Sequence, residues 1–217
     1  MTLVIANKNY SSWSMRAWLV LRHFGFRFDE IVIPLDEPDT RSRILVHSPS
    51  GKVPCLVADG TPIWDTLAII EYLAETAPKK RIWPEQPRAR ATARSCSAEM
   101  HAGFSALRRA CPMNLRKTFA FRSWGGAAAA ADVKRIEAMW AQLLERFGGP
   151  FLFGEFCAAD AMYAPVVARL RGYGWPMAPA TAAYVGRMEA LPAYREWRDA
   201  GVAETSIIPS DEVSETA

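Results

Sequence analysis

Cysteine and histidine are both scarce in this chain, and the few that are present are scattered. None of the four cysteines stands in a Cys-x-x-Cys pair, so the ligand spacing of a zinc site and the motif of a dithiol redox centre are both missing. The three histidines are too dispersed to indicate a metal site. We therefore expect no metal, and we interpret the cysteines as small apolar residues in a reducing compartment. These residues are Cys55, Cys96, Cys111 and Cys157, and His23, His47 and His101.

Long apolar runs are also missing. No stretch approaches the roughly 20 apolar residues that a membrane-spanning helix needs. The N-terminus lacks the charged segment, apolar core and cleavage site of a secretory signal. The net charge is only +3, and the basic residues are spread along the chain instead of gathered into a stripe. We expect a cytoplasmic protein that binds neither a membrane nor nucleic acid.

The first third of the chain has the pattern of an α/β domain. Residues 2–6 and 28–33 are typical of strands, and residues 15–24 between them have apolar positions at helical spacing. Such a unit joins parallel strands by a right-handed crossover. An irregular helix over 36–46, a hairpin around Asp59-Gly60 and a helix over 66–75 follow. This order predicts a thioredoxin-like domain at residues 1–77.

The rest of the chain predicts helices alone. Residues 78–87 have the proline-rich, polar composition of a linker. Helical periodicity then covers 88–110, 128–147, 158–170 and 181–190, so we expect an all-helical domain at 88–217, with a loose acidic tail after Ile208. Asp160 falls where a carboxylate can cap its own helix, and we favour this role over a catalytic one. Pro165 predicts a kink there, or a helix held straight by packing.

The most informative motif runs from Lys52 to Thr66. A cis Val53-Pro54 bond at the start of a strand would turn the Val53 backbone outward, where it could pair with an extended peptide. Asp65 and Thr66 begin the next helix, whose free N–H groups and positive dipole end attract a carboxylate. Together these features predict a cradle for a short peptide with a free amino-acid end.

Over nearly the whole chain, these features resemble a cytosolic glutathione S-transferase. The most specific piece is the Lys52-to-Thr66 motif, and residues 156–165 resemble the helix-opening motif of the family's second domain, with Cys157 replacing the usual Ser or Thr. Residues 11–16 resemble the zeta-like bacterial branch of the family, which has Ser-Ser-Cys at this place. In this chain Trp13 replaces the cysteine. The resemblance implies a thioredoxin-like domain followed by a helical bundle, glutathione as co-substrate, and a homodimer.

The resemblance also implies which hydroxyl activates the glutathione thiol. It places this hydroxyl at Ser11, with Ser12 and Ser14 as close competitors and Tyr10 as a further alternative. A hydroxyl that donates to the sulfur beside a helix N-terminus stabilises the thiolate, which is the nucleophile. Lowering the thiol pKa by two units takes about 2.7 kcal/mol. One charge-assisted hydrogen bond and a helix end can supply this, so no general base is required.

The tripeptide-binding residues follow from the same resemblance. Val53, beside Pro54, would pair its backbone with the cysteinyl part of glutathione. Asp65 and Thr66 would hold the γ-glutamyl end, and Lys52 is placed to meet the glycyl carboxylate.

A small hydrophobic electrophile is expected to bind where the two domains meet. Trp13 would lie in the loop beside the sulfur, and His101, Phe104 and Arg108 would line the pocket from the first long helix. The predicted reaction is conjugation or a glutathione-dependent isomerisation of the zeta type. Two alternatives stay open: a non-catalytic glutathione- or ligand-binding protein, and a glutathione-dependent disulfide reductase, which the missing Cys-x-x-Cys pair disfavours.

Overall fold

A four-stranded mixed sheet lies at one end of the molecule, and the computed structural model describes it within residues 1–214. The strand order is β2-β1-β3-β4, with β1 (Thr2–Ile5) parallel to β2 (Asp29–Val32) and antiparallel to β3 (Cys55–Ala58). β3 and β4 (Thr61–Trp64) form the expected hairpin, in which Asp59 and Gly60 both have positive φ. The predicted parallel crossover and hairpin are confirmed.

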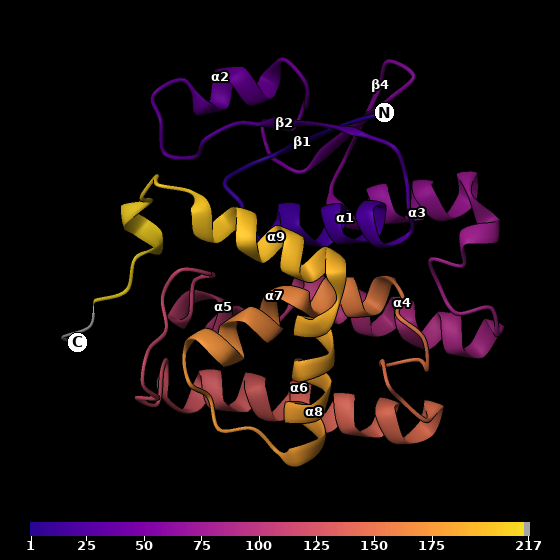
Figure 1. Ribbon diagram of the computed structural model, residues 1–217, viewed down its shortest axis with the longest axis vertical. Coiled ribbons are helices and arrows are strands. Elements are labelled where there is room, and N and C mark those ends of the chain that lie inside the picture. Colours follow the sequence, from indigo (N-terminus) through magenta and orange to yellow (C-terminus); the bar gives the residue numbers. More distant parts are fainter. Residues whose placement is uncertain (215–217) are drawn as a thin grey trace.

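Helices α1 (Ser12–His23) and α3 (Thr66–Thr76) lie between this sheet and the helical part of the chain, whereas α2 (Thr40–Leu45) lies at the outer end (Figure 1). α1 begins three residues earlier than its apolar periodicity indicates, because the Ser11 side chain caps its first turn. Trp13 therefore lies in the first turn of a helix, and its predicted place in a loop was wrong.

The second half is helical, and its described residues add only isolated β-bridges near residues 151–155. The predicted helix at 88–110 is in fact two helices, because Gly103 is extended and Phe104 is left-handed. The last long helix had not been predicted. The elements are η1 (Pro78–Lys80), α4 (Pro87–Ala102), α5 (Ser105–Ala110), α6 (Gly126–Phe147), α7 (Ala158–Gly172), α8 (Pro179–Ala190), α9 (Pro192–Ala203) and η2 (Pro209–Asp211).

The segment after Ile208 is not loose as far as the structure describes it. Ile208 is buried, residues 209–211 form η2, and Glu212 makes hydrogen bonds to two side chains of the folded body. A polar, acidic composition predicts disorder only when such side chains lack partners, and here the partners come from distant parts of the sequence. The rest of the predicted tail, residues 215–217, lies outside the described residues.

One continuous apolar core joins the sheet to the helical half. α1 packs against α3, α7 and α9, and the core contains the fully buried Trp18, Trp140 and Trp197. α7 is buried along nearly its whole length and runs through Pro165 without ending, as strong packing predicts. Apolar contacts join residues before the linker to residues after it, so one core covers both predicted domains. The division into residues 1–77, 78–87 and 88–217 stays a prediction.

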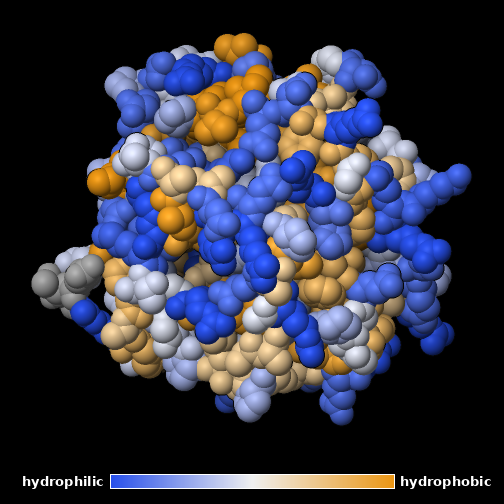
Figure 2. All heavy atoms as spheres, viewed as in Figure 1, coloured by the Kyte–Doolittle hydropathy of each residue, from blue (hydrophilic) through white to orange (hydrophobic). Residues whose placement is uncertain are grey.

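The surface is mixed in character. The face drawn in Figure 2 alternates hydrophilic and hydrophobic side chains, with an apolar cluster at the end that carries α2. In the part of the chain that the structure describes, no helix has both the length and the apolar character needed to cross a membrane.

Candidate active site

Two adjoining cavities lie where the first turns of α1 and α3 meet the helical half. The serine cavity, of about 460 Å³, is lined by Ser11 and Ser12. The Asp65 cavity, of about 610 Å³, is lined by Asp65 and Thr66. Both cavities share Trp13, Lys52, Val53 and Arg108 as walls. The structure thus brings together most of the residues that the sequence singled out, including Pro54 and His101 in the Asp65 cavity.

The segment before β3 has the backbone geometry that the sequence predicts. The Val53-Pro54 bond is cis. Val53 precedes the first ladder pair of β3, Cys55 with Val4, and its own N–H and C=O make no hydrogen bond within residues 1–214. An unpaired backbone at the wall of a cavity can receive an extended peptide as an additional strand.

The start of α3 is tied to α1 and α4. Asp65 caps α3 by accepting from the Leu67 N–H at 2.9 Å, and its other oxygen lies 2.7 Å from His101 Nε2. The buried Thr66 donates its hydroxyl to the Trp13 carbonyl at 3.2 Å. His101 therefore lines the Asp65 cavity, and its role in an electrophile pocket stays a prediction.

The three candidate serines have different surroundings. Ser14 is fully buried in the core, where its hydroxyl accepts from the Ala6 N–H at 3.1 Å and from Ser11 Oγ at 2.7 Å. Ser14 lines neither cavity, so the prediction that it competes with Ser11 as a contact of the thiol is corrected. Ser11 and Ser12 both face the serine cavity at the N-terminal end of α1. Tyr10 also lines this cavity, but its hydroxyl bonds to Glu212 at 2.5 Å.

Trp13 contacts two guanidinium groups. The central carbon of Arg16 lies 4.4 Å from the centre of the Trp13 ring, and that of Arg108 lies 4.9 Å from it. Arg16 is fully buried and donates to the carbonyls of Met162 and Ser12. Burial, together with the nearby positive charges of Arg169 and Arg108, lowers the pKa of Arg16 well below its usual value.

Phe104 does not reach either cavity. It is buried at the start of α5, where its ring packs against Tyr163 at 6.4 Å between centres. Its left-handed backbone starts the new helix and carries the side chain into the core. The prediction that Phe104 lines the electrophile pocket is corrected, whereas Trp13 and Arg108 do line the serine cavity.

Three charged residues of the serine cavity had not been predicted. Arg169 on α7 is buried and donates to the carbonyls of Cys111 and Pro165, at 2.7 and 3.3 Å. Burial lowers its pKa to about 10. Arg41 and Asp211 complete the polar lining. An arginine in the apolar run Val-Val-Ala-Arg-Leu was the available signal for Arg169, since buried charges are rarely placed without a partner or a function.

The serine cavity is strongly cationic. Arg41, Lys52, Arg108 and Arg169 line it, against one carboxyl group, that of Asp211. Burial raises the pKa of Asp211, while the positive charge of Arg169 opposes this shift. A cavity with this charge balance favours a thiolate or carboxylate ligand. No group of three or more His, Cys, Asp or Glu side chains within the described residues could hold a metal ion.

Comparison with known proteins shows the family to which the chain belongs. Residues 10–76 match the profile described as glutathione S-transferase, N-terminal domain, and residues 126–200 match the corresponding C-terminal domain. A probable maleylacetoacetate isomerase from Caenorhabditis elegans is 30% identical over 173 residues, covering 77% of this chain and 78% of that protein. The maleylacetoacetate isomerase of Rattus norvegicus is 28% identical over 170 residues, covering 77% of each.

Solved structures of glutathione transferases have the same fold as this chain. A glutathione transferase homologue from Burkholderia GL BGR1, solved with bound glutathione, is 27% identical, with a TM-score of 0.70, and the alignment covers 94% of this chain and 98% of that one. A bacterial maleyl pyruvate isomerase of the zeta class superposes with a TM-score of 0.74 at 20% identity, covering 95% of this chain and all of that one. The fold, the two matched domains and the isomerase relatives together show that this chain is an enzyme of the glutathione S-transferase family.

Proposed function

We propose that this enzyme activates the thiol of glutathione for attack on a small electrophile that carries a carboxylate, by conjugation or by isomerisation. One observation carries the proposal. Two serine hydroxyls at a helix N-terminus line a cationic cavity that shares a wall, Val53, with a second cavity shaped for a peptide end.

Glutathione fits the two cavities as an extended peptide. The unpaired backbone of Val53 would bond to the cysteinyl residue, next to Pro54, and direct the thiol toward Ser11 and Ser12. The γ-glutamyl end would occupy the Asp65 cavity, where Asp65 receives the ammonium group and the start of α3 at Thr66 receives the carboxylate. Lys52 would receive the glycyl carboxylate.

Ser11 is the proposed donor to the thiolate, with Ser12 as its competitor. In the structure Ser11 donates to Ser14, yet a hydroxyl rotates freely, so the pair can exchange donor and acceptor. Ser14 would then donate to Ser11, and the Ser11 proton would point to the sulfur. The positive end of α1 and the cationic wall add to the stabilisation of the thiolate.

Arg108 and Arg169 are the proposed partners of the electrophile's carboxylate. Both line the serine cavity, and Arg169 is held rigidly by its bonds to two carbonyls. In an isomerisation, the thiolate adds to a carbon–carbon double bond, the resulting single bond rotates, and elimination returns the thiolate. Glutathione is therefore regenerated, and the arginines would stabilise the negative charge that the substrate carries after addition.

The test measures the thiol pKa of bound glutathione by ultraviolet titration in wild type, Ser11→Ala and Ser12→Ala. Ser95→Ala is the control, because Ser95 is an exposed serine whose hydroxyl donates to the Ala91 carbonyl of its own helix. We expect Ser11→Ala to raise the thiol pKa by one to two units, about 1.4 to 2.7 kcal/mol, with little change in glutathione affinity. An effect of Ser12→Ala alone would transfer the role to Ser12. Binding without a thiolate in the wild type would favour a non-catalytic binder.

A second measurement addresses the substrate class. Replacing Arg108 or Arg169 by methionine should lower kcat/KM at least ten-fold for an electrophile with a carboxylate, and much less for its methyl ester. Equal losses for both compounds would refute the carboxylate assignment. A glutathione-dependent disulfide reductase is disfavoured, since no cysteine stands among the residues that line the two cavities.

We also infer a homodimer in the cytoplasm, with a division between domains at residues 78–87. The half-exposed Trp64 on the edge strand β4 supports a partner surface there.

Sedimentation should give twice the mass of one chain, and a monomer at micromolar concentration would contradict the dimer. Limited proteolysis should cut first at 78–87 if that segment is the boundary.

A further inference from the structure

The loop that leads from β1 to Ser11, the proposed donor to the thiolate, is held by residues near the C-terminus. We call residues 7–10 the serine loop and residues 204–213 the C-terminal strap. Every residue of the serine loop bonds to the strap. Asn7 donates to Ser206 Oγ at 2.8 Å, the backbone N–H groups of Lys8 and Asn9 donate to Glu204 at 2.7 and 3.0 Å, and Tyr10 donates to Glu212 at 2.5 Å.

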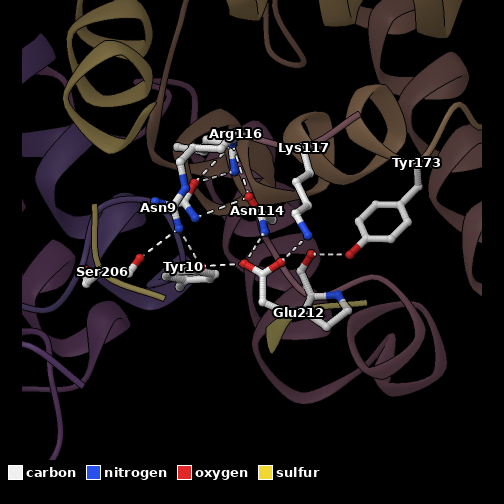
Figure 3. Close-up of polar contacts among 10 residues, drawn as sticks. Asn9, Tyr10, Asn114, Arg116, Lys117, Tyr173, Ser206 and Glu212 are labelled. Carbon is white, nitrogen blue, oxygen red and sulfur yellow. Dashed lines mark hydrogen bonds and ion pairs between the residues drawn. The ribbon is translucent and has the colours of Figure 1, made fainter. Parts of the chain in front are cut away.

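Figure 3 shows how the contacts converge on Tyr10 and Glu212. Arg116 Nη2 donates to the Tyr10 hydroxyl at 2.6 Å, and that hydroxyl donates in turn to Glu212. Asn114 donates to the same carboxylate oxygen at 3.0 Å, and Lys117 lies 2.6 Å from the other one. The bond from Tyr10 is therefore one member of a network that links the serine loop, residues 114–117 and the strap.

The charges in this network favour an ionised Glu212. Burial acts to raise the pKa of this carboxyl, but the hydrogen bonds from Lys117, Tyr10 and Asn114 outweigh burial and bring the pKa below its usual value. Arg116 faces the same network from the 114–117 segment. At neutral pH Glu212 is thus a fixed negative acceptor, which gives the bond to Tyr10 a charge-assisted character.

The serine loop passes this restraint directly to Ser11. The Ser11 N–H donates to the Asn7 carbonyl at 2.8 Å, and the Met15 N–H donates to the Ser11 carbonyl at 3.1 Å. Ser11 is therefore held between the strapped loop and the first turn of α1. The residue before Glu212 in the strap, Asp211, lines the serine cavity, so the same segment also forms a wall of the site.

We infer that the C-terminal strap positions the thiol-activating serine, and that Glu212 is a positioning residue that acts through Tyr10. The inference rests on the proposed role of Ser11 as the donor to the thiolate. Small displacements of a catalytic group reduce the rate strongly, whereas the tripeptide is bound mainly by residues outside the strap. The strap should therefore influence kcat and the thiol pKa more than the affinity for glutathione.

The experiment compares Glu212→Ala and Tyr10→Phe with Glu196→Gln in the full chain. Glu196 on α9 is a suitable control because it forms an exposed ion pair with Arg22 in the last turn of α1, and neither residue lines the serine cavity or the Asp65 cavity. Three experiments are made: titration of the thiol of bound glutathione for its pKa, steady-state kinetics for kcat and KM, and hydrogen exchange of the Lys8 and Asn9 amides. Tyr10→Phe removes only one hydroxyl, so it keeps the test informative if Glu212→Ala folds poorly.

We expect Glu212→Ala and Tyr10→Phe to lower kcat about ten-fold, to raise the thiol pKa by about one unit and to speed amide exchange in the serine loop, with the KM for glutathione within two-fold of wild type. If both variants keep the thiol pKa and kcat of Glu196→Gln, the inference is overturned, even if exchange increases. Failure of the proposed function looks different, because the thiol pKa of the wild type itself would then be unperturbed, or Ser11→Ala would have no effect.

Discussion

Asp160 provides a prediction whose size follows from the structure. This fully buried carboxylate accepts three hydrogen bonds, from the Cys157 N–H at 2.9 Å, the Leu152 N–H at 3.1 Å and the Tyr184 hydroxyl at 2.9 Å. These donors belong to the start of α7, the preceding loop and α8. The capping role predicted from the sequence is confirmed, and the side chain also joins two further segments.

Two substitutions separate the hydrogen bonds from the charge. Asp160→Ala leaves three buried donors without an acceptor, which should cost about 4 kcal/mol of unfolding free energy. Asp160→Asn can keep its oxygen toward Leu152 and Tyr184, since both donate to the same oxygen, and loses only the bond from Cys157. We expect about 1 to 2 kcal/mol for Asn at neutral pH. The corresponding falls in Tm are about 12 and 4 °C.

The pH dependence has a defined sign. Burial raises the pKa of Asp160 from 3.8 to about 6, although its hydrogen bonds oppose the shift. A carboxyl with a raised pKa in the folded state stabilises most below its unfolded pKa, and this contribution is lost as the pH rises through the folded value. The stability advantage of wild type over Asp160→Asn should therefore shrink by about 2 kcal/mol between pH 4.5 and 7.5.

Urea unfolding of the three proteins at both pH values measures these differences directly. Tyr194→Phe is a control, because Tyr194 is a buried residue outside this network. Equal losses for the Ala and Asn variants would refute the hydrogen-bond reasoning. A wild-type advantage that stays constant, or grows, from pH 4.5 to 7.5 would refute the direction of the pKa shift.

Three further predictions concern the site and the thiols. Lys52→Ala should raise the KM for glutathione several-fold with kcat unchanged in steady-state assays, and an unchanged KM would remove Lys52 from the glycyl carboxylate. His101→Ala should also raise that KM, because Asp65 loses its partner at 2.7 Å, and a change confined to the electrophile's KM would contradict its place in the Asp65 cavity. Burial raises the pKa of the Cys96 thiol to about 12 and that of Cys111 to about 11. Iodoacetamide at pH 8 should therefore leave both thiols unlabelled in the native protein. Rapid labelling, detected by mass spectrometry, would show that they are accessible.

The local parts of this protein were predictable from its sequence. Short apolar, β-branched runs identified the strands and the 3.6-residue apolar period identified most helices, because burial imposes these patterns wherever the element lies. The Val53-Pro54 motif and the Asp65-Thr66 helix start were predicted for the same reason, since proline geometry and helix capping depend on neighbours in sequence. The role of Asp160 as a cap is a further local feature, determined within four residues of chain.

Only the tertiary structure decided which side chains meet at the site. Ser14 is turned into the core by the periodicity of α1, and Phe104 is carried inward by a left-handed backbone that composition does not indicate. Arg169 reaches the serine cavity from α7, and Glu212 reaches Tyr10 across 202 positions of sequence. Such contacts depend on how distant segments pack together, and a hydrogen bond leaves no periodic trace in the sequence of either partner. The sequence alone therefore determined the elements and the cradle, whereas packing determined the charge of the cavity and the segment that holds its serine.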